Sequence, residues 1–456
     1  MSLCVAALAL TIVVGSCGSS AGPSPLLRPH MKTGDDAGSG AEGGAVPSPL
    51  PETDWFSEAG HGIFTHFLNG LQNNYGRNSG GKNSTWDQCV TEFDVEAYAS
   101  DAAATGAKYA FITMMQDDQY MIAPNARFDN LTGYRPGEAC STRDLVLDLS
   151  AALNKRGLKL LLYWTGDGPA NDPKGAAGMK IDGTPPGTNV EFVRRWTSVL
   201  REYAVRYGDK VHGWWVDGCY FGAGGYGYND TTLQYYHDAI RAGNPQAVIG
   251  LNNGVHPVID SGSRWEAGGE TTKWEDMTAG ETNSFNNWAP SGMPRSRWAT
   301  GPTAGSVPMP FQKTEELTTV QWHQLSFLGS QWAAPGTCTC SGMLAPNCSV
   351  AGCSEFAPDQ LKVYTQSINA VGGVLTVDLQ LLRNGSLNQA QVGALRSAWD
   401  ESRWLCAADH GNSTCCCGQA AKCGGPAKGV ETGDQCKADK PTCVGFQYGS
   451  TYGHCV

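Results

Sequence analysis

The sequence is poor in charge, and most of its charge is negative. Only 16% of the 456 residues are Asp, Glu, Lys or Arg, and the formal net charge is -11. Proteins that bind nucleic acid or an anionic membrane use a basic face, so this balance argues against both partners. Beyond the N-terminus there is also no apolar segment long enough to cross a bilayer.

Two kinds of binding motif are missing as well. No Gly-rich phosphate loop follows the first expected strand, and the cysteine spacing fits no zinc pattern. The sequence therefore implies neither an organic cofactor nor a metal. In their place stand 58 Gly, 14 Trp and 16 Tyr, a composition that suits a secreted protein binding neutral, hydroxyl-rich ligands.

Residues 1–20 are expected to be a signal peptide. Leu3 to Gly15 is apolar, too short to span a bilayer comfortably, and is followed by small residues, although no positively charged stretch precedes it. Val14-Gly-Ser-Cys17 also resembles a lipoprotein processing site, so lipid attachment through Cys17 is an alternative. Residues 21–50 are rich in Gly, Ser and Pro and are expected to form a linker. We expect a secreted or lumenal, lysosome-like location.

Most of the 17 cysteines lie late in the chain, and eight of them fall between Cys406 and Cys455. Such density indicates disulfides in an oxidising compartment. Residues 405–456 contain too few aliphatic residues to fold without crosslinks, so we expect a separate disulfide-rich module. Its Phe446, Tyr448 and Tyr452 form either a carbohydrate-binding face or a small core. A metal site at Cys415-Cys416-Cys417 is a weaker alternative.

Two smaller signals concern export. Omitting Cys4 and Cys17 leaves an odd number of cysteines, and Cys219, far from the clusters, is the candidate for an unpaired thiol. Glycosylation in a secretory route is compatible with six Asn-x-Ser/Thr sequons, at Asn83, Asn130, Asn229, Asn347, Asn384 and Asn412.

Strands and helices alternate strictly over residues 51–404, which predicts parallel pairing with right-handed crossovers. We expect strands at 61–68, 107–115, 158–165, 211–216, 247–251 and 374–382, and helices at 94–105, 142–156, 190–207, 231–242, 358–370 and 389–404. The pattern blurs between about 260 and 325. A doubly wound sheet and a (β/α)8 TIM-type barrel both fit, and polar residues at many strand ends favour the barrel.

Asp217 is the most informative of these strand-end residues. It ends the apolar run Val211-His-Gly-Trp-Trp-Val and is followed directly by glycine. A charge in this position is costly to desolvate, so it points to a catalytic carboxylate at the mouth of the barrel. The alternative is an Asp that caps the following helix.

A glycosidase needs a second carboxyl group on the other side of the scissile bond. The span from Trp265 to Glu281 is rich in acids, and its glycines suggest a loop above the barrel. Glu281 is the predicted acid/base. Glu270 is the first alternative, followed by Glu266 and Glu275.

These segments together resemble the α-L-fucosidases of glycoside hydrolase family 29 over about residues 54–404. Trp55-Phe56-Ser-Glu-Ala-Gly-His-Gly-Ile-Phe-Thr-His66 is similar to the first-strand motif of that family, and Trp215-Val216-Asp217-Gly218 is similar to its Trp-Phe-Asp-Gly segment, whose Asp is the nucleophile. Further matches are Gly106-Ala-Lys-Tyr109, Arg143-Asp-Leu-Val146, Gly157-Leu-Lys159, Asp276-Met-Thr-Ala-Gly-Glu281, Gly372-Gly373 and Asn384-Gly-Ser386.

The resemblance implies the substrate-binding residues. His66 matches a sugar-binding His, whereas the two family histidines at the second strand are replaced by Gln116 and Asp117, and Asp118 is retained. We expect all four to bond sugar hydroxyls. Trp164 is the expected aromatic platform, and Trp86 is a weaker candidate. The usual C-terminal β-sandwich has no counterpart here, and the cysteine-rich module follows instead.

The resemblance thus implies a retaining exo-glycosidase that releases terminal α-L-fucose from glycans through a covalent glycosyl-enzyme. The loss of two histidines keeps two alternatives open. One is a carbohydrate-binding protein without catalysis, and the other is a glycosidase of galactosyl-type specificity.

Overall fold

The computed structural model describes residues 53–219, 226–252, 274–281, 321–336, 358–369 and 372–400, together with the short antiparallel strands β8 (Cys443–Val444) and β9 (His454–Cys455). The expected signal peptide and linker, most of the 405–456 module, and the candidates Glu266 and Glu270 lie outside these residues.

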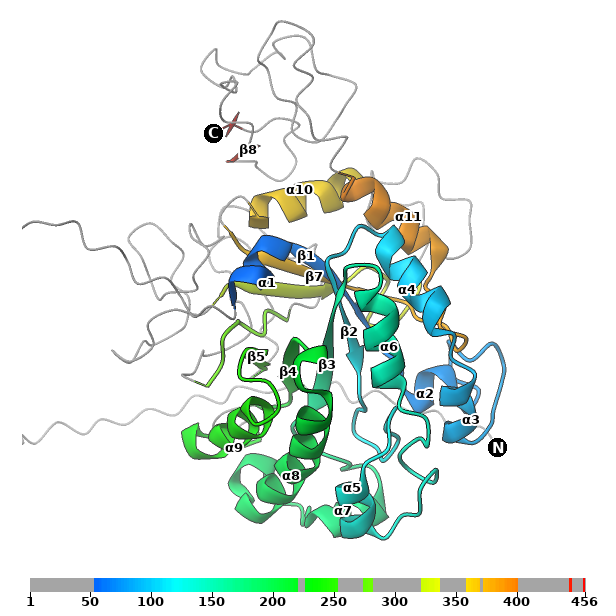
Figure 1. The fold of residues 1–456 in the computed structure, drawn as a ribbon, viewed down its shortest axis with the longest axis vertical. Coiled ribbons are helices and arrows are strands. Elements are labelled where there is room, and N and C mark those ends of the chain that lie inside the picture. The colour runs from blue at the N-terminus through cyan, green and yellow to red at the C-terminus, as the bar shows by residue number, and fades with distance from the viewer. Residues whose placement is uncertain are drawn as a thin grey trace, which may run out of the picture. The chain divides into compact units, whose positions relative to one another are not determined.

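Seven parallel strands form one curled sheet at the centre of the described chain (Figure 1). The order across the sheet is β5-β4-β3-β2-β1-β7-β6, so β5 and β6 are its edges. The strands are β1 (His61–Thr65), β2 (Tyr109–Thr113), β3 (Lys159–Thr165), β4 (Gly213–Asp217), β5 (Val248–Leu251), β6 (His323–Phe327) and β7 (Val374–Leu379).

Helices follow most strands and lie along the outside of the sheet (Figure 1). Several begin at a side chain that accepts hydrogen bonds from the first turn, such as Asp144 before α6 and Asn229 before α9. The α-helices are α1 (Asp54–Ala59), α2 (Asn69–Gln72), α3 (Trp86–Thr91), α4 (Val95–Ala104), α5 (Ala126–Thr132), α6 (Leu145–Asn154), α7 (Pro173–Met179), α8 (Val190–Tyr207), α9 (Asp230–Arg241), α10 (Pro358–Asn369) and α11 (Gln389–Ala398). Two 3-10 turns, η2 (Pro186–Thr188) and η3 (Gly208–Lys210), flank α8.

The gap between the edge strands is filled by residues 274–281, which the sequence had suggested to be a loop above the barrel. The N–H groups of Asp276 and Met277 donate to Ile249 O of β5, at 2.8 and 3.1 Å. On the other side, parallel bridges join Met277 to Gln321 and Glu281 to Leu325. For residues 274–281 that expectation is wrong, because this segment occupies the eighth position of the barrel wall. Residues 265–273 of the expected loop lie outside the described residues.

Irregular hydrogen bonding explains why the eighth position lacks a strand pattern. The carboxylates of Asp276 and Glu275 accept the N–H groups of Ile249 and Leu251, and so replace part of a backbone ladder. Asp276 also pairs with Arg241 at 2.6 Å. With this segment in place the wall has eight positions, and the (β/α)8 prediction is confirmed.

The two faces of the sheet bury different side chains, as the alternation along each strand requires. Tyr109, Phe111, Tyr163 and Trp215 point into the barrel and form one apolar cluster. Their neighbours point outward to the helices and form a larger cluster, which includes Ile63, Ile112, Leu162, Trp164, Trp214 and Val216. On each strand, a side chain that serves a site inside the barrel must therefore lie an even number of residues from the inward-pointing side chains.

Most expected elements match the observed ones, and the differences are at their ends. Helix α8 has the expected bounds, and β6 was missed because it lies beside the region without a clear pattern. Helix α11 ends at Ala398 rather than 404, because Trp399 leaves the helical conformation and its indole N–H donates to Thr365.

Three cysteines in the described residues are free thiols, and all of them are buried. Cys219 is one of them, as expected, and Cys89 and Cys140 are the others. In the same residues, no helix combines the length and the apolar content that crossing a bilayer requires.

Close packing inside the barrel depends on small residues opposite large rings. A Cβ atom at Gly62 would lie 2.3 Å from the ring of Tyr109, which is fully buried and donates or accepts a hydrogen bond at Thr376. The absence of a side chain at position 62 is what allows the Tyr109 ring to fill the lower barrel.

We expect Gly62→Ala to reduce the free energy of unfolding by about 1–3 kcal/mol, the usual effect of overpacking a core. Gly70→Ala is the matched control, because a Cβ there meets nothing within 4 Å. Urea denaturation of both variants measures the difference. Equal stability of the two variants would contradict the packing described for Tyr109.

Candidate active site

Asp217 ends strand β4 and points into the barrel. Its Oδ2 accepts the hydroxyl of Tyr163 at 2.8 Å, and its Oδ1 accepts the amide of Asn252 at 2.7 Å and the N–H of Gly218 at 2.8 Å. Burial raises the pKa of Asp217 above its ordinary value, while these hydrogen bonds act in the opposite direction. The carboxylate is thus held in a fixed orientation and largely removed from water.

Glu281 ends the eighth position of the wall and lies close to Asp217. Its Oε2 accepts from the same Asn252 nitrogen that donates to Asp217, with hydrogen bonds of 2.5 and 2.7 Å, so the two oxygens lie within about 5.2 Å of each other. Burial, and then the charge of Asp217, raise the pKa of Glu281 to about 8. One carboxyl group is therefore favoured in its protonated form beside another at neutral pH.

His66 follows strand β1 and is held by a carboxylate that the sequence analysis did not identify. Its Nδ1 lies 2.8 Å from Oδ1 of Asp378 in strand β7, and the other oxygen of Asp378 accepts the N–H of Ala333 at 2.6 Å. Asp378 is a lone carboxylate in the buried run Val374–Leu379. The signal that identified Asp217 would have identified it as well.

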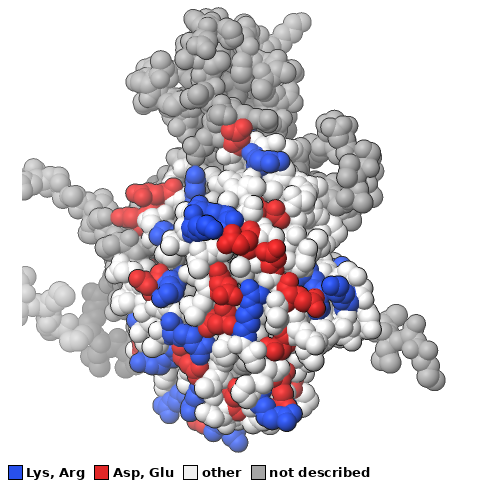
Figure 2. Space-filling model, turned by 45° about the vertical axis from the view of Figure 1, so that its right-hand side comes forward, with Lys and Arg blue, Asp and Glu red and all other residues white. Residues whose placement is uncertain are grey.

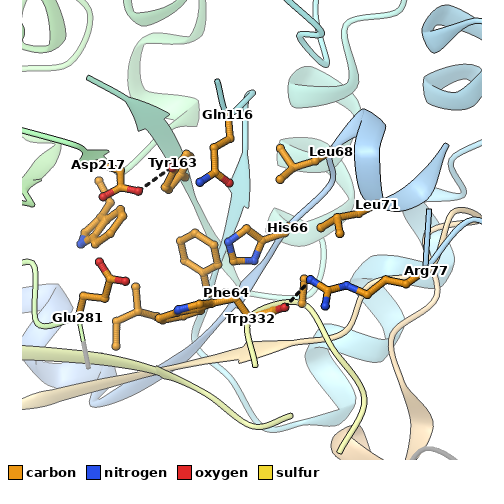
Figure 3. A pocket seen from close by; sticks show the side chains of 13 residues that line it. Phe64, His66, Leu68, Leu71, Arg77, Gln116, Tyr163, Asp217, Glu281 and Trp332 are labelled. Atoms are coloured by element: carbon orange, nitrogen blue, oxygen red, sulfur yellow. Dashed lines mark hydrogen bonds between the residues drawn. The ribbon is translucent and has the colours of Figure 1, made fainter. Parts of the chain in front are cut away.

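These side chains surround one cavity of about 240 Å³ (Figure 3). His66, Gln116, Asp217 and Glu281 supply polar groups, and Arg77 lies at one side. The rest of the lining is apolar or aromatic: Phe64, Leu68, Leu71, Tyr163, Trp215, Leu325, Trp332 and Ala333. Polar groups that converge in a largely apolar cavity are typical of a small-molecule site.

The other two predicted residues of the second-strand loop lie apart from this cavity. Gln116 lines it, whereas Asp117 and Asp118 do not. Asp117 has a left-handed backbone with φ of 60°, and its carboxyl bonds to Asp167. Asp118 accepts the N–H of Tyr120 at 2.8 Å. Burial raises the pKa of Asp117 to about 8, and the charges of Asp167 and Asp217 add to this effect; burial likewise raises the pKa of Asp118 to about 7.

Trp164 is not the aromatic platform, and that expectation is wrong. Its side chain points outward, is fully buried and stacks on Trp196 of α8 with ring centroids 4.4 Å apart. The aromatic walls are Trp215 and Trp332 instead. Trp215 stacks on Tyr163 and donates its indole N–H to Ala279 O at 3.0 Å. Strand alternation decides this, since Trp215 shares the parity of Asp217.

Two other candidates have structural roles. Trp86 is buried and donates its indole N–H to Met121 O at 2.8 Å, outside the cavity lining. Glu275 accepts the N–H of Leu251 in the barrel wall. Among the residues that the structure describes, no group of three or more His, Cys, Asp or Glu is arranged to hold a metal.

The surface carries acidic and basic side chains side by side. On the face drawn in Figure 2, red and blue patches alternate without a continuous basic area. An anionic polymer would find no extended basic track on this face.

A family model described as alpha-L-fucosidase matches residues 45–320, which is more than half of the chain. The chain belongs to the alpha-L-fucosidase family. Its barrel is therefore the catalytic domain of a glycoside hydrolase, and the match includes both Asp217 and Glu281. Comparison with curated protein sequences gives no match.

Solved structures share the fold at low identity. An endo-fucoidan hydrolase of glycoside hydrolase family 107 has a TM-score of 0.53 and 14% identity over 78% of this chain and 54% of its own, so this chain spans about half of that hydrolase. Another endo-fucoidan hydrolase of that family has a TM-score of 0.51 and 14% identity, over 77% of this chain and 93% of its own. An alpha-L-fucosidase from Lactobacillus casei has a TM-score of 0.48 and 16% identity, over 78% of this chain and 100% of its own.

The raised pKa of Glu281 predicts how stability depends on pH. Below its ordinary pKa of 4.5 the group is protonated in both the folded and the unfolded chain. As the pH rises from about 4.5 to 8 the unfolded chain loses this proton while the folded fucosidase domain retains it, so the contribution of Glu281 to stability declines.

Glu281→Gln cannot ionise, so we expect its unfolding free energy to fall less steeply over this pH range than that of the unchanged protein. Denaturant titrations between pH 4.5 and 8 measure the slope. Glu58→Gln is the control, because Glu58 is exposed on α1. A slope equal to that of the unchanged protein would mean that Glu281 titrates normally.

Proposed function

We propose that this protein is a retaining exo-α-L-fucosidase, with Asp217 as the nucleophile and Glu281 as the acid/base. The single observation that carries the proposal is the shared Asn252 amide, which holds the two carboxyl groups within about 5.2 Å. Retaining glycosidases place their carboxyl groups roughly 5–5.5 Å apart, whereas inverting enzymes need roughly 6.5–9.5 Å to admit a water molecule.

The protonation states fit these roles. Asp217 receives three hydrogen bonds that favour the carboxylate, which is the form that attacks the anomeric carbon. Glu281, with a pKa of about 8, holds the proton that the departing oxygen needs. In the second step Glu281 accepts a proton from water, the water oxygen bonds to the anomeric carbon, and the ester to Asp217 breaks.

The cavity suits one 6-deoxy sugar. Its volume of about 240 Å³ is below the roughly 300–1,000 Å³ of sites that hold drug-sized ligands. Leucine and aromatic side chains can contact the methyl group of fucose, and His66 and Gln116 can bond its hydroxyls. These features favour release of a terminal residue over cleavage within a chain.

Gln116 motivates a second candidate, a glycosidase of galactosyl-type specificity. It lines the cavity where the family has a histidine, and it offers both a donor and an acceptor. Product analysis on a mixed panel of fucosylated and galactosylated oligosaccharides separates the two candidates. We further propose that the protein is exported, with glycans as its substrates.

Replacing Glu281 or Asp217 by alanine should lower activity, and the product formed with azide should differ between the two variants. Glu281→Ala should lower kcat by ~10²–10⁴, the usual effect of losing a positioned proton donor. On an activated aryl fucoside, azide should restore activity and yield the α-fucosyl azide, because it attacks the glycosyl-enzyme. Asp217→Ala with azide should yield the β-azide, because attack is then direct. NMR of the products assigns the anomeric configuration.

Glu275→Gln is the matched control, since Glu275 lies in the same segment and contacts the backbone of Leu251. It should retain its azide-independent activity. If azide leaves Glu281→Ala unchanged, another residue is the acid/base; if Asp217→Ala keeps its activity, the nucleophile assignment is wrong.

A further inference from the structure

Arg77 is the one Lys or Arg among the described residues that line the cavity, and no step of the proposed reaction uses it. It lies in the loop between α2 and α3, is exposed, and reaches the cavity beside His66 (Figure 3). Its Nη2 donates to Trp332 O at 3.0 Å. In the described part of the chain this is the hydrogen bond it forms, and no carboxylate pairs with it there. A guanidinium has five N–H donors, so most remain available.

The backbone that carries Arg77 is held firmly in place. The next residue, Asn78, is buried, and its N–H donates to Leu71 O at 2.9 Å while its own carbonyl accepts the N–H of Arg383 at 3.0 Å. Its side chain bonds to Ala333 O at 3.0 Å and to Gln380 at 2.8 Å. Arg77 therefore does not extend from a loosely attached loop.

The rest of the loop is fastened from the other side by Arg383. Its guanidinium donates to Asn73 Oδ1 at 2.7 Å, to Gln72 O at 3.2 Å and to Ser84 Oγ at 2.6 Å. Asn74 and Tyr75 have left-handed backbones, with φ of 48° and 58°, which are unfavourable for side chains of this size. Such a loop shape persists only when many contacts fix it.

We propose that Arg77 forms a subsite for an anionic substituent on the sugar substrate, either a sulfate ester or a carboxylate. The inference rests on the proposed fucosidase function and specifies the substrate class. Both anions accept paired N–H donors from one guanidinium, in the geometry that makes Arg the preferred partner of planar or tetrahedral oxyanions.

Negative charge at and next to the cavity makes a cationic partner necessary for an anionic substrate. The carboxylate of Asp217 lines the cavity and that of Asp378 lies next to it, so an anionic substrate without a cationic partner would be repelled. The carboxylate of Asp378 is already engaged by His66 and Ala333. The charge of Asp378 does act on Arg77 and raises the pKa of its guanidinium, against the lowering by burial, but no hydrogen bond between the two side chains has to break when an anion binds.

A purely structural role is the competing explanation for Arg77. In that case it would only fix the Trp332 carbonyl and so position one aromatic wall of the cavity. Its removal would then impair neutral and anionic substrates equally. An anion subsite predicts unequal effects, and a kinetic comparison separates the two.

The experiment compares 4-nitrophenyl α-L-fucoside with its 2-, 3- and 4-O-sulfates, and with the analogue that has a carboxylate in place of the C6 methyl group. For the unchanged protein we expect at least one anionic substrate to have a kcat/KM at least tenfold higher than the neutral one. Arg77→Gln should reduce this ratio by about 10–100-fold, mainly through KM, as expected for loss of a charge-assisted bond. The substrate with the raised kcat/KM shows whether the subsite prefers a sulfate ester or a carboxylate, and at which ring position.

Lys82→Gln is the matched control, because it removes one positive charge from the same loop at a residue outside the cavity lining. It should leave the ratio unchanged, and Arg77→Lys should retain part of it. A preference for the neutral substrate, or an equal loss for all substrates in Arg77→Gln, overturns the anion subsite.

A direct binding measurement keeps the two proposals distinguishable if no fucoside is hydrolysed. Calorimetric titration with methyl α-L-fucoside and its sulfates then tests Arg77 alone. If a sulfate binds more tightly and Arg77→Gln removes this gain, the subsite is supported while the fucosidase proposal fails. If the sulfates and the neutral fucoside bind with equal affinity, both to the unchanged protein and to Arg77→Gln, the subsite is overturned.

Discussion

The Asn252 amide group donates its two hydrogens to two carboxyl groups at the mouth of the barrel, and the chemistry of the site depends on this contact. Two buried carboxylates so close together repel, and one of them is relieved by keeping a proton. Both groups are buried, and burial raises the pKa of each. Among the described residues, Asp217 accepts three hydrogen bonds that favour its ionised form and Glu281 accepts one, so the proton is favoured on Glu281. Different environments thus give two similar side chains different roles.

The barrel wall is what holds these three residues together. Asp217, Asn252 and Glu281 come from three successive wall positions, and all have inward parity. Because the wall positions are fixed by backbone hydrogen bonds to their neighbours, these bonds fix the separation of the carboxyl groups. The His66–Asp378 pair is positioned in the same way across β1 and β7.

Predictions from the sequence succeeded where one strand or helix carries the signal by itself. Helix α8, the strand that ends in Asp217, and the alternation that implies a barrel all depend on local periodicity. The prediction of Trp164 as the aromatic platform failed, because a residue near a strand end points into the barrel only if it shares the parity of Asp217, as Trp215 does and Trp164 does not. The prediction of a loop at residues 274–281 failed because side-chain carboxylates replace part of the backbone hydrogen bonding of this wall segment.

The sequence alone determined the fold class, the family resemblance, and the residues at the ends of strands, since these follow from short-range pattern. It also nominated Glu281, but it could not bring Glu281 beside Asp217. Only the tertiary structure decided that Asn252 joins the two, that Asp378 supports His66, and that Arg77 reaches the cavity. Each of these contacts connects residues that are far apart in the chain, and long-range contacts depend on how the barrel closes rather than on local sequence.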